Sequence, residues 1–134
     1  MEELFGGTAL NTLILIGIGG FIGAIFRYSL CGWVQNVFLS FPAGTLSVNF
    51  IGSLLLSFIM YSTEYKDIFN EETRIFLTIG LLGSFTTMSA FSYESFKLFE
   101  SKESFIFVVN VAATLISVLF AIYLGRFIAS SVFK

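Results

Sequence analysis

Polar side chains recur at helical spacing inside two apolar runs of this sequence. One run carries four of them at steps of four residues: Thr45, Asn49, Ser53 and Ser57. A later run carries three that share a helix face: Asn110, Thr114 and Ser117. Such faces can line a polar path or hold helices together, because Ser and Thr also bond to their own helix backbone. Asn49 and Asn110 are harder to explain by packing, because a carboxamide has two donors and two acceptor positions to satisfy.

The segment from Gly80 to Phe91 is poor material for a continuous helix. It combines glycines with Ser84 and the consecutive residues Thr86 and Thr87. Irregular backbone at membrane depth is tolerated only where protein or a cavity surrounds it, and the freed carbonyls can coordinate a cation. A hard cation such as sodium prefers oxygen ligands of this kind. We therefore predict a break at Gly83–Thr86 that holds an ion, with an unbroken packing helix as the alternative.

Two ionisable residues and a glycine pair also fall inside apolar runs. Arg27 lies near the end of the first run, and Glu94 lies one turn beyond the polar segment of the third. Charged groups in a membrane usually face the bundle interior or a water-filled path, although Arg27 is close enough to the end to snorkel. Gly19-x-x-x-Gly23 is typical of close helix packing, which we prefer to a ligand role.

The amino-acid composition indicates whether these elements fold in water or in a lipid bilayer. The chain has 134 residues, of which 56% are hydrophobic and 12% charged, including 18 Phe. Its mean hydropathy is +0.90. A soluble domain needs roughly twice this charged fraction to cover its surface, and a disordered chain is poor in aromatic residues. The sequence therefore predicts an integral membrane protein.

Several function classes are excluded by the residues that the chain lacks. It has no histidine and a single cysteine, Cys31, so it can form neither an intrachain disulfide nor a His- or Cys-rich zinc site. A net charge of −2 argues against a nucleic-acid partner. No nucleophile–base pair or metal-ligand cluster occurs in the apolar runs, so we predict that the protein is not an enzyme.

The spacing of the apolar runs predicts one membrane domain over residues 1–134. A spanning helix needs about 20 mostly apolar residues. Four runs satisfy this requirement, over residues 10–33, 43–61, 74–99 and 105–128. The first is a retained helix and not a cleaved signal peptide, because it is too long and is preceded by Glu2 and Glu3 where a basic segment would be expected.

The basic residues give only a weak preference for one orientation. With four spans, both termini share a side with the middle connection, and that side carries Lys66, Arg74, Arg126 and Lys134. The opposite side carries Lys97 and Lys102, with Arg27 close to it. Under the positive-inside rule this bias is small. Either other features set a unique orientation, or copies insert both ways and pair antiparallel.

Three ordered blocks resemble the Fluc/CrcB family of fluoride channels. They are Gly19-Gly20-x-x-Gly23-Ala24-x-x-Arg27-Tyr28, Gly44-Thr45-Leu46-x-Val48-Asn49-x-x-Gly52-Ser53, and Gly83-x-x-Thr86-Thr87-x-Ser89-x-Phe91-x-x-Glu94. Each block is weak alone, but all three in order on a four-span chain of this length are specific. The resemblance covers the first three runs and, more loosely, the fourth.

The resemblance implies a fold, a function and a location. The fold is all-α, with four transmembrane helices of which the third is broken, assembled as an antiparallel dual-topology homodimer. The dimer contains two fluoride pores and a central structural sodium ion. It lies in the lipid bilayer of a prokaryotic plasma or inner membrane. There it exports cytoplasmic fluoride down its gradient and so reduces fluoride toxicity.

The resemblance also implies roles for individual residues. The sodium is held by the backbone carbonyls of Gly83 and Thr86. The fluoride pathway comprises Arg27, Thr45, Asn49, Thr87, Met88, Ser89, Phe91, Glu94 and Thr114. The chain departs from the family pattern at Met88, where a second pore Phe is usual, and at Ser84, where a second Gly is common.

Two other classes fit a short four-span chain. A small multidrug-type transporter is also a dual-topology dimer, but it needs a mid-membrane carboxylate for proton–substrate exchange, and only Glu94 lies inside a run. A non-transporting assembly protein would need neither stacked polar faces nor a broken helix. Ion and dye flux from liposomes distinguishes these classes from a fluoride channel.

Overall fold

The computed structural model describes residues 7–134 as four antiparallel membrane-length spans. The first is α1 (Gly7–Val37), and the second is α2 (Ala43–Lys66). The third extends over Glu71–Glu100, and the fourth is α6 (Ser104–Phe133). Each is long and apolar enough to cross a membrane, and the described part of the chain contains no strand. The prediction of an all-helical, four-span membrane protein is confirmed.

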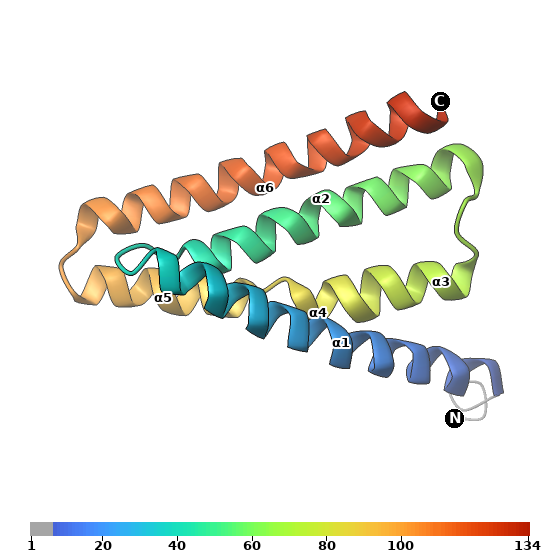
Figure 1. Cartoon of the computed structure of the whole chain (residues 1–134), viewed down its shortest axis with the longest axis horizontal. Helices are drawn as coiled ribbons and strands as arrows, with labels where there is room; N and C mark the ends of the chain where they lie inside the picture. The colour runs from blue at the N-terminus through green and yellow to red at the C-terminus, as the bar shows by residue number, and fades with distance from the viewer. Residues whose placement is uncertain (1–6) are drawn as a thin grey trace.

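Short connections place the chain ends at one end of the bundle. The chain crosses the bundle in alternating directions, so the start of α1, the α2–α3 connection and the end of α6 lie together, as Figure 1 shows. The α1–α2 and α5–α6 connections lie at the opposite end. α2 ends at Lys66 because Asp67 adopts a left-handed conformation (φ 48°) and its N–H bonds to the Thr63 carbonyl. The helices extend beyond the apolar runs because polar residues continue them towards water.

The third span consists of four segments in succession. These are α3 (Glu71–Ile75), the π-helix η1 (Phe76–Leu82), α4 (Gly83–Phe85) and α5 (Met88–Glu100). Asn70 caps α3 by accepting a hydrogen bond from the Thr73 N–H at 2.9 Å. Between α4 and α5, Thr86 (φ −84°, ψ 155°) and Thr87 (φ −150°, ψ 115°) have extended backbones. Extended conformations suit β-branched residues, and the Thr87 hydroxyl caps α5 by accepting from the Ala90 N–H.

Glycines bring α1 into backbone contact with η1. A Cβ on Gly23 would overlap the carbonyl oxygen of Leu81, and a Cβ on Gly19 would lie 2.7 Å from the carbonyl oxygen of Phe76. On the other side of this contact, a Cβ on Gly80 would lie 3.0 Å from the Ile16 carbonyl oxygen. The packing role predicted for Gly19-x-x-x-Gly23 is confirmed, and the contact fixes the third span against the first.

Replacement of Gly23 by alanine tests this contact. Gly23→Ala should lower the free energy of unfolding by about 1–3 kcal/mol, because the new methyl group meets backbone that cannot rotate away. Gly17→Ala, on the same helix, is the matched control because a Cβ there meets nothing within 4 Å. The control should be neutral, or stabilising by up to about 1 kcal/mol from helix propensity. Thermal unfolding in detergent measures both, and equal stabilities would contradict the packing described here.

The interior of the bundle combines polar and apolar side chains, and its outside is apolar. The buried polar residues are Thr45, Asn49, Ser57, Ser62, Thr87, Ser95, Asn110 and Thr114. Large hydrophobic side chains such as Phe21 and Leu119 point outward and are about 70% exposed, at 69% and 71%. An apolar exterior of this kind suits a lipid surround, in which outward apolar groups cost nothing.

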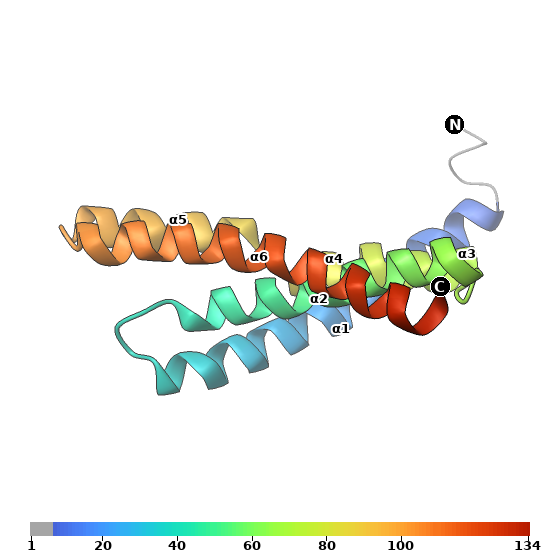
Figure 2. The same ribbon diagram turned by 90° about the horizontal axis from the view of Figure 1, so that it is seen from above.

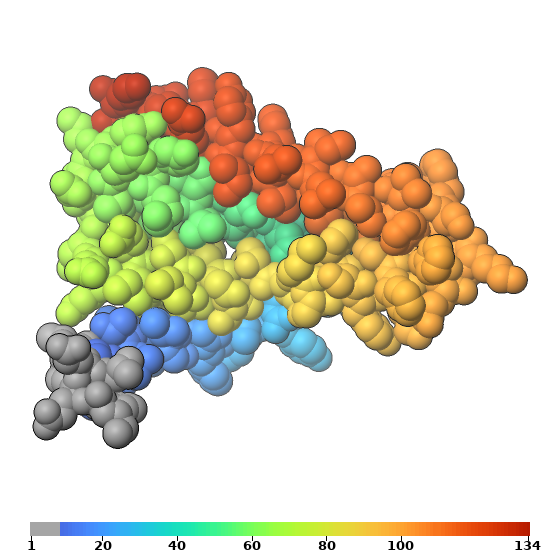
Figure 3. Space-filling model, turned by 180° about the vertical axis from the view of Figure 1, so that it is seen from behind, coloured from blue at the N-terminus to red at the C-terminus, as the bar shows by residue number. Residues whose placement is uncertain are grey.

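The bundle opens at the end that carries the α1–α2 and α5–α6 connections. Seen from above, the α5–α6 pair diverges there from the α1–α2 pair (Figure 2). Seen from behind, the ends of α5 and α6 project beyond α1 as an arm (Figure 3). Nearer the other end, α6 packs closely on α2, where Ser57 Oγ donates to the Ile122 carbonyl at 2.6 Å. Four of the buried polar residues, Thr45, Asn49, Thr87 and Thr114, line hollows in the bundle.

Candidate functional site

Asn49 and the backbone of Thr87 form a reciprocal pair of hydrogen bonds. Asn49 Nδ2 donates to the Thr87 carbonyl at 3.0 Å, and Asn49 Oδ1 accepts from the Thr87 N–H at 2.7 Å. Both residues are buried. The extended backbone of Thr87 lacks helical partners, so the carboxamide replaces them. One of the two N–H groups on Asn49 Nδ2 remains for another acceptor.

A hollow of about 230 Å³, which we call the inner hollow, lies beside this pair. Its lining residues are Asn49, Ser53, Leu56, Thr86, Thr87, Met88, Phe91, Thr114, Leu115 and Val118. The Thr114 hydroxyl is buried, and among residues 7–134 it has no hydrogen-bond partner. A buried hydroxyl without a partner is costly in a membrane, so it marks a place where a polar species can be accepted.

Phe91 and Met88 contribute differently to the inner hollow. Phe91 is buried at 7% exposure, whereas Met88 is 67% exposed. Both residues are on α5, and the Phe91 ring therefore has a fixed position while the Met88 thioether projects from the chain. Ser89 is exposed, and its hydroxyl lies 3.1 Å from that of Thr87.

A second hollow of about 350 Å³, the middle hollow, contains the two ionisable residues singled out in the sequence. It is lined by Arg27, Tyr28, Cys31, Gly32, Gln35, Thr45, Thr87, Ala90 and Glu94. Thr45 Oγ1 donates to Glu94 Oε1 at 2.7 Å. Glu94 Oε2 and Arg27 Nε are buried without a hydrogen-bond partner in the described chain. The hollow therefore offers an unused donor and an unused acceptor on opposite charges.

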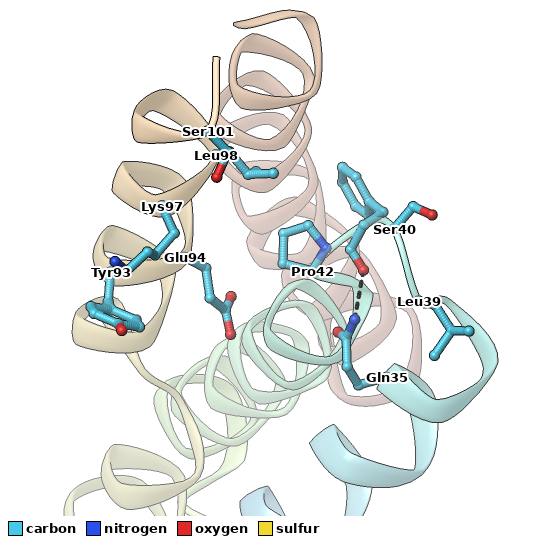
Figure 4. Close-up of a pocket in the computed structure, with 10 residues that line it drawn as sticks. Gln35, Leu39, Ser40, Pro42, Tyr93, Glu94, Lys97, Leu98 and Ser101 are labelled. Atoms are coloured by element: carbon cyan, nitrogen blue, oxygen red, sulfur yellow. Dashed lines mark hydrogen bonds between the residues drawn. The ribbon is translucent and has the colours of Figure 1, made fainter. Parts of the chain in front are cut away.

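A third hollow of about 250 Å³, the outer hollow, lies between α5 and the α1–α2 connection (Figure 4). It is lined by Gln35, Leu39, Ser40, Phe41, Pro42, Tyr93, Glu94, Lys97, Leu98 and Ser101. Gln35 fixes the connection: its Nε2 donates to the Phe38 and Phe41 carbonyls at 2.7 and 3.0 Å. Its Oε1 accepts from the Gly44 N–H at 3.3 Å. The Glu94 side chain points into the hollow opposite Pro42.

The three hollows form a series through shared lining residues. Gln35 and Glu94 line both the outer and the middle hollow. Thr87 lines both the middle and the inner hollow. The series begins beside the α1–α2 connection at the open end and reaches the extended backbone within the third span. Eight of the predicted pathway residues line one or more of these hollows: Arg27, Thr45, Asn49, Thr87, Met88, Phe91, Glu94 and Thr114. Ser89 lines none of the three hollows, but its hydroxyl is within hydrogen-bond distance of the hydroxyl of Thr87, which lines two of them.

The extended backbone also changes the hydrogen bonding of two carbonyl groups. In a continuous helix, the Thr87 and Ala90 N–H groups would bond to the carbonyls of Gly83 and Thr86. Here the Thr87 N–H bonds to Asn49 Oδ1, and the Ala90 N–H bonds to Thr87 Oγ1 at 3.1 Å. The Gly83 and Thr86 carbonyl oxygens are thereby released from the helical ladder. Residues 7–134 contain no group of three or more His, Cys, Asp or Glu side chains that could hold a metal.

Other residues of the two polar faces serve packing. Asn110 Nδ2 donates to Ser95 Oγ at 3.0 Å, which ties α6 to α5. Ser117 Oγ bonds to the Thr114 carbonyl on its own helix at 3.1 Å. Sequence reasoning missed Ser95 and Gln35 as functional neighbours. Ser95 follows Phe91 by four residues and so was visible as part of a helix face, whereas the bonds of Gln35 depend on the path of the connection.

A four-span membrane protein in which a series of hollows, each with some polar lining residues, joins one end of the bundle to a non-helical segment has the features of a channel or transporter. Comparison with known proteins identifies the group. The pattern of the CrcB-like protein family (Camphor Resistance, CrcB) matches residues 14–126, and the chain belongs to this family. The predicted resemblance to the Fluc/CrcB family is confirmed.

Individual relatives match over most of their length. The "Fluoride-specific ion channel FluC 1" of Methanosarcina acetivorans is 59% identical over 117 residues, covering 87% of this chain and 89% of the relative. The "Fluoride-specific ion channel FluC 3" of Methanosarcina barkeri is 51% identical over 123 residues, covering 92% and 93%. The "Fluoride-specific ion channel FluC" of Geotalea daltonii is 42% identical over 117 residues, covering 87% and 94%.

Proposed function

We propose that this chain is a fluoride-specific channel of a prokaryotic membrane, through which fluoride leaves the cytoplasm down its gradient. The names of its relatives support this function. The structural observation that supports it best is the inner hollow, where the unpartnered Thr114 hydroxyl, the spare Asn49 N–H and the Phe91 ring lie around one space. The protein moves an ion without changing it chemically, so no catalytic residue is assigned.

The inner hollow suits an anion that must bind weakly enough to leave. Fluoride is small and strongly hydrated, and hydroxyl and amide donors replace part of its water. The edge of an aromatic ring carries partial positive charge, so Phe91 attracts an anion without a full charge that would trap it. The inner hollow contains no charged side chain among its lining residues. Selectivity then comes from donors in a confined space.

We propose that the functional unit is an antiparallel homodimer inserted in both orientations. Met88 and Ser89 belong to the pathway and yet are exposed on the single chain. A polar path open to lipid is energetically unfavourable, so a second surface must cover it. A second copy of the chain can supply this surface. Its own exposed pathway residues need the same cover, which the first copy supplies in return. The near balance of basic residues between the two ends supports insertion both ways.

The dual insertion is tested by locating the C-terminus. A C-terminal tag on cells or inverted vesicles should react with an impermeant label from both membrane sides in comparable amounts, because the charge bias between the ends is small. The control is the same tag on a variant with three extra lysines in the α2–α3 connection, which should shift the population to one side. A one-sided result for the unmodified protein would contradict pairing by dual insertion.

We propose that the released carbonyl oxygens of Gly83 and Thr86 hold a structural sodium ion together with those of the second copy. The residues fit such an ion, because two backbone oxygens per chain lack their helical donors and oxygen is the ligand that a hard cation prefers. Bound there, sodium would neutralise the negative ends of these carbonyl dipoles. It would bind the two copies and take no part in conduction.

Substitution at Gly83 separates an effect on the dimer from an effect on the single chain. A Cβ on Gly83 would meet only the Thr78 carbonyl oxygen, at 3.6 Å, so the fold of one chain has room for a side chain. We expect Gly83→Leu to abolish dimerisation while helicity is retained, because the side chain crowds the axis. Thr86→Ser, which keeps the carbonyl, should dimerise normally. Cross-linking and circular dichroism measure the two properties, and a fully dimeric Gly83→Leu would contradict the proposed axis.

The cellular function is tested by fluoride tolerance. A fluoride-sensitive bacterial strain that lacks its own exporter should grow in fluoride when it expresses this chain. Expression of Asn49→Leu at the same level should not restore growth. If the unmodified chain reaches the membrane and gives no tolerance, the proposed role in fluoride export is wrong.

A further inference from the structure

Lys97 lines the outer hollow and stands, in sequence, between two carboxylates of α5, those of Glu94 and Glu100. On α5 it is three residues after Glu94 and three residues before Glu100, and residues three apart on a helix are neighbours. Its ammonium group is 3.0 Å from Glu100 Oε2 and 5.8 Å from the centre of the Tyr93 ring. Figure 4 shows Lys97 and Glu94 on successive turns, with the Lys97 ammonium group beside Tyr93 and the Glu94 carboxylate directed away from it towards Pro42.

The two carboxylates differ in how well they are satisfied. Glu94 Oε1 accepts a hydrogen bond from Thr45, whereas Glu94 Oε2 is buried and without a partner in the described residues. Glu100 is half exposed and accessible to water. Lys97 therefore pairs with Glu100, which water can already solvate, and not with Glu94, whose Oε2 atom has no hydrogen-bond partner in the described residues. An exposed pair of this kind is weak, because both side chains are 49–56% exposed and screened by water.

A negative Glu94 is an obstacle to an anion that enters by the outer hollow. Glu94 is the only acidic residue that lines the outer, middle or inner hollow. The cations that share these spaces with it are Arg27 in the middle hollow and Lys97 in the outer hollow. An anion approaching from the open end meets Lys97 and Glu94 first, so the pairing of these two residues decides the potential at the entrance.

We propose that Lys97 is a mobile countercharge that sets fluoride entry, moving from Glu100 to the unpartnered oxygen of Glu94. In this position it cancels the repulsion that Glu94 exerts on an incoming anion. Lys97 thus acts on the ion only through its charge at the entrance, and it does not line the inner hollow. This inference rests on the proposed fluoride channel function.

The experiment measures fluoride efflux from liposomes that contain the purified protein, at two ionic strengths set with an impermeant salt. Lys97→Gln should lower the efflux rate about tenfold at an ionic strength of about 0.01 M, where the Debye length is about 30 Å. The deficit should nearly disappear at about 1 M, where the Debye length is about 3 Å. Lys102→Asn removes the same charge from the same end but does not line the outer hollow, and it should behave as the unmodified protein.

Two further variants distinguish charge pairing from a structural role. Glu100→Gln frees Lys97 for Glu94, so its efflux at low ionic strength should equal or exceed that of the unmodified protein. Lys97→Arg should restore most of the rate lost in Lys97→Gln. A salt-independent loss in Lys97→Gln, or an equal loss in Glu100→Gln, would overturn the inference. Absence of efflux from the unmodified protein would instead overturn the proposed function, so the two failures are separable.

Discussion

Asn49→Leu should abolish or nearly abolish fluoride efflux while the protein still inserts and dimerises. The substitution removes both hydrogen bonds to the Thr87 backbone and the remaining N–H donor of a side chain that lines the inner hollow. Each buried polar group left without its partner costs about 1–3 kcal/mol, which corresponds to a tenfold to hundredfold effect. The loss of a donor to the ion and the displacement of Thr87 act together, so we expect at least a hundredfold reduction. Liposome efflux measures it.

Asn110→Leu is the matched control for this substitution. Asn110 is also a buried asparagine, whose Nδ2 donates to Ser95 Oγ, but it does not line any of the three hollows. It should cost a comparable amount of stability and retain most of the efflux. If the two variants lose efflux equally, the loss reflects general damage to the bundle. If Asn49→Leu conducts normally, Asn49 is not part of the pathway.

Phe91→Ile should leave almost no fluoride conduction. Isoleucine fills part of the space but has no ring edge, so the partial positive charge that attracts an anion in the inner hollow is lost. Phe91 is buried at 7% exposure and has one fixed position, which no neighbour can replace. Fluoride efflux and dimer content, measured together, check this expectation. Normal conduction by Phe91→Ile would show that this ring does not line the pathway.

Met88→Phe is the companion of that substitution and should remain active. Met88 stands where the resemblance to the family predicts a second aromatic residue, and it is 67% exposed on the single chain. Its methyl group next to sulfur is weakly positive and its side chain is flexible, so it offers a similar surface to an anion. Restoring the aromatic ring should therefore preserve selective efflux. Loss of fluoride efflux in Met88→Phe would mean that the thioether has a role that an aromatic ring cannot fill.

The spans and the polar residues were predictable because each rests on local pattern. Steps of four residues place Thr45 and Asn49 on one face, and both do contact the third span. The same pattern did not separate their roles from that of Ser57, which bonds to α6. Periodicity gives a face of a helix, but the neighbour that this face meets depends on how the helices cross.

Other features of the site depend on tertiary contacts that no local pattern contains. The π-helix η1 lies in backbone contact with the glycines of α1, and no sequence rule identified it. The reciprocal bond between Asn49 and Thr87 joins residues 38 positions apart. The sequence did not single out Gln35, because one amide near the end of an apolar run does not form part of a repeated polar pattern. Its importance appears only when the α1–α2 connection folds back over it.

The most direct test of the account compares three cargoes in the same liposomes. The purified protein is reconstituted with fluoride, chloride or a cationic dye inside, and valinomycin carries the compensating potassium. We predict rapid loss of fluoride, retention of chloride and of dye, and no dependence of the fluoride rate on an imposed proton gradient. Equal release of chloride, or dye movement coupled to protons, would contradict a fluoride-specific channel.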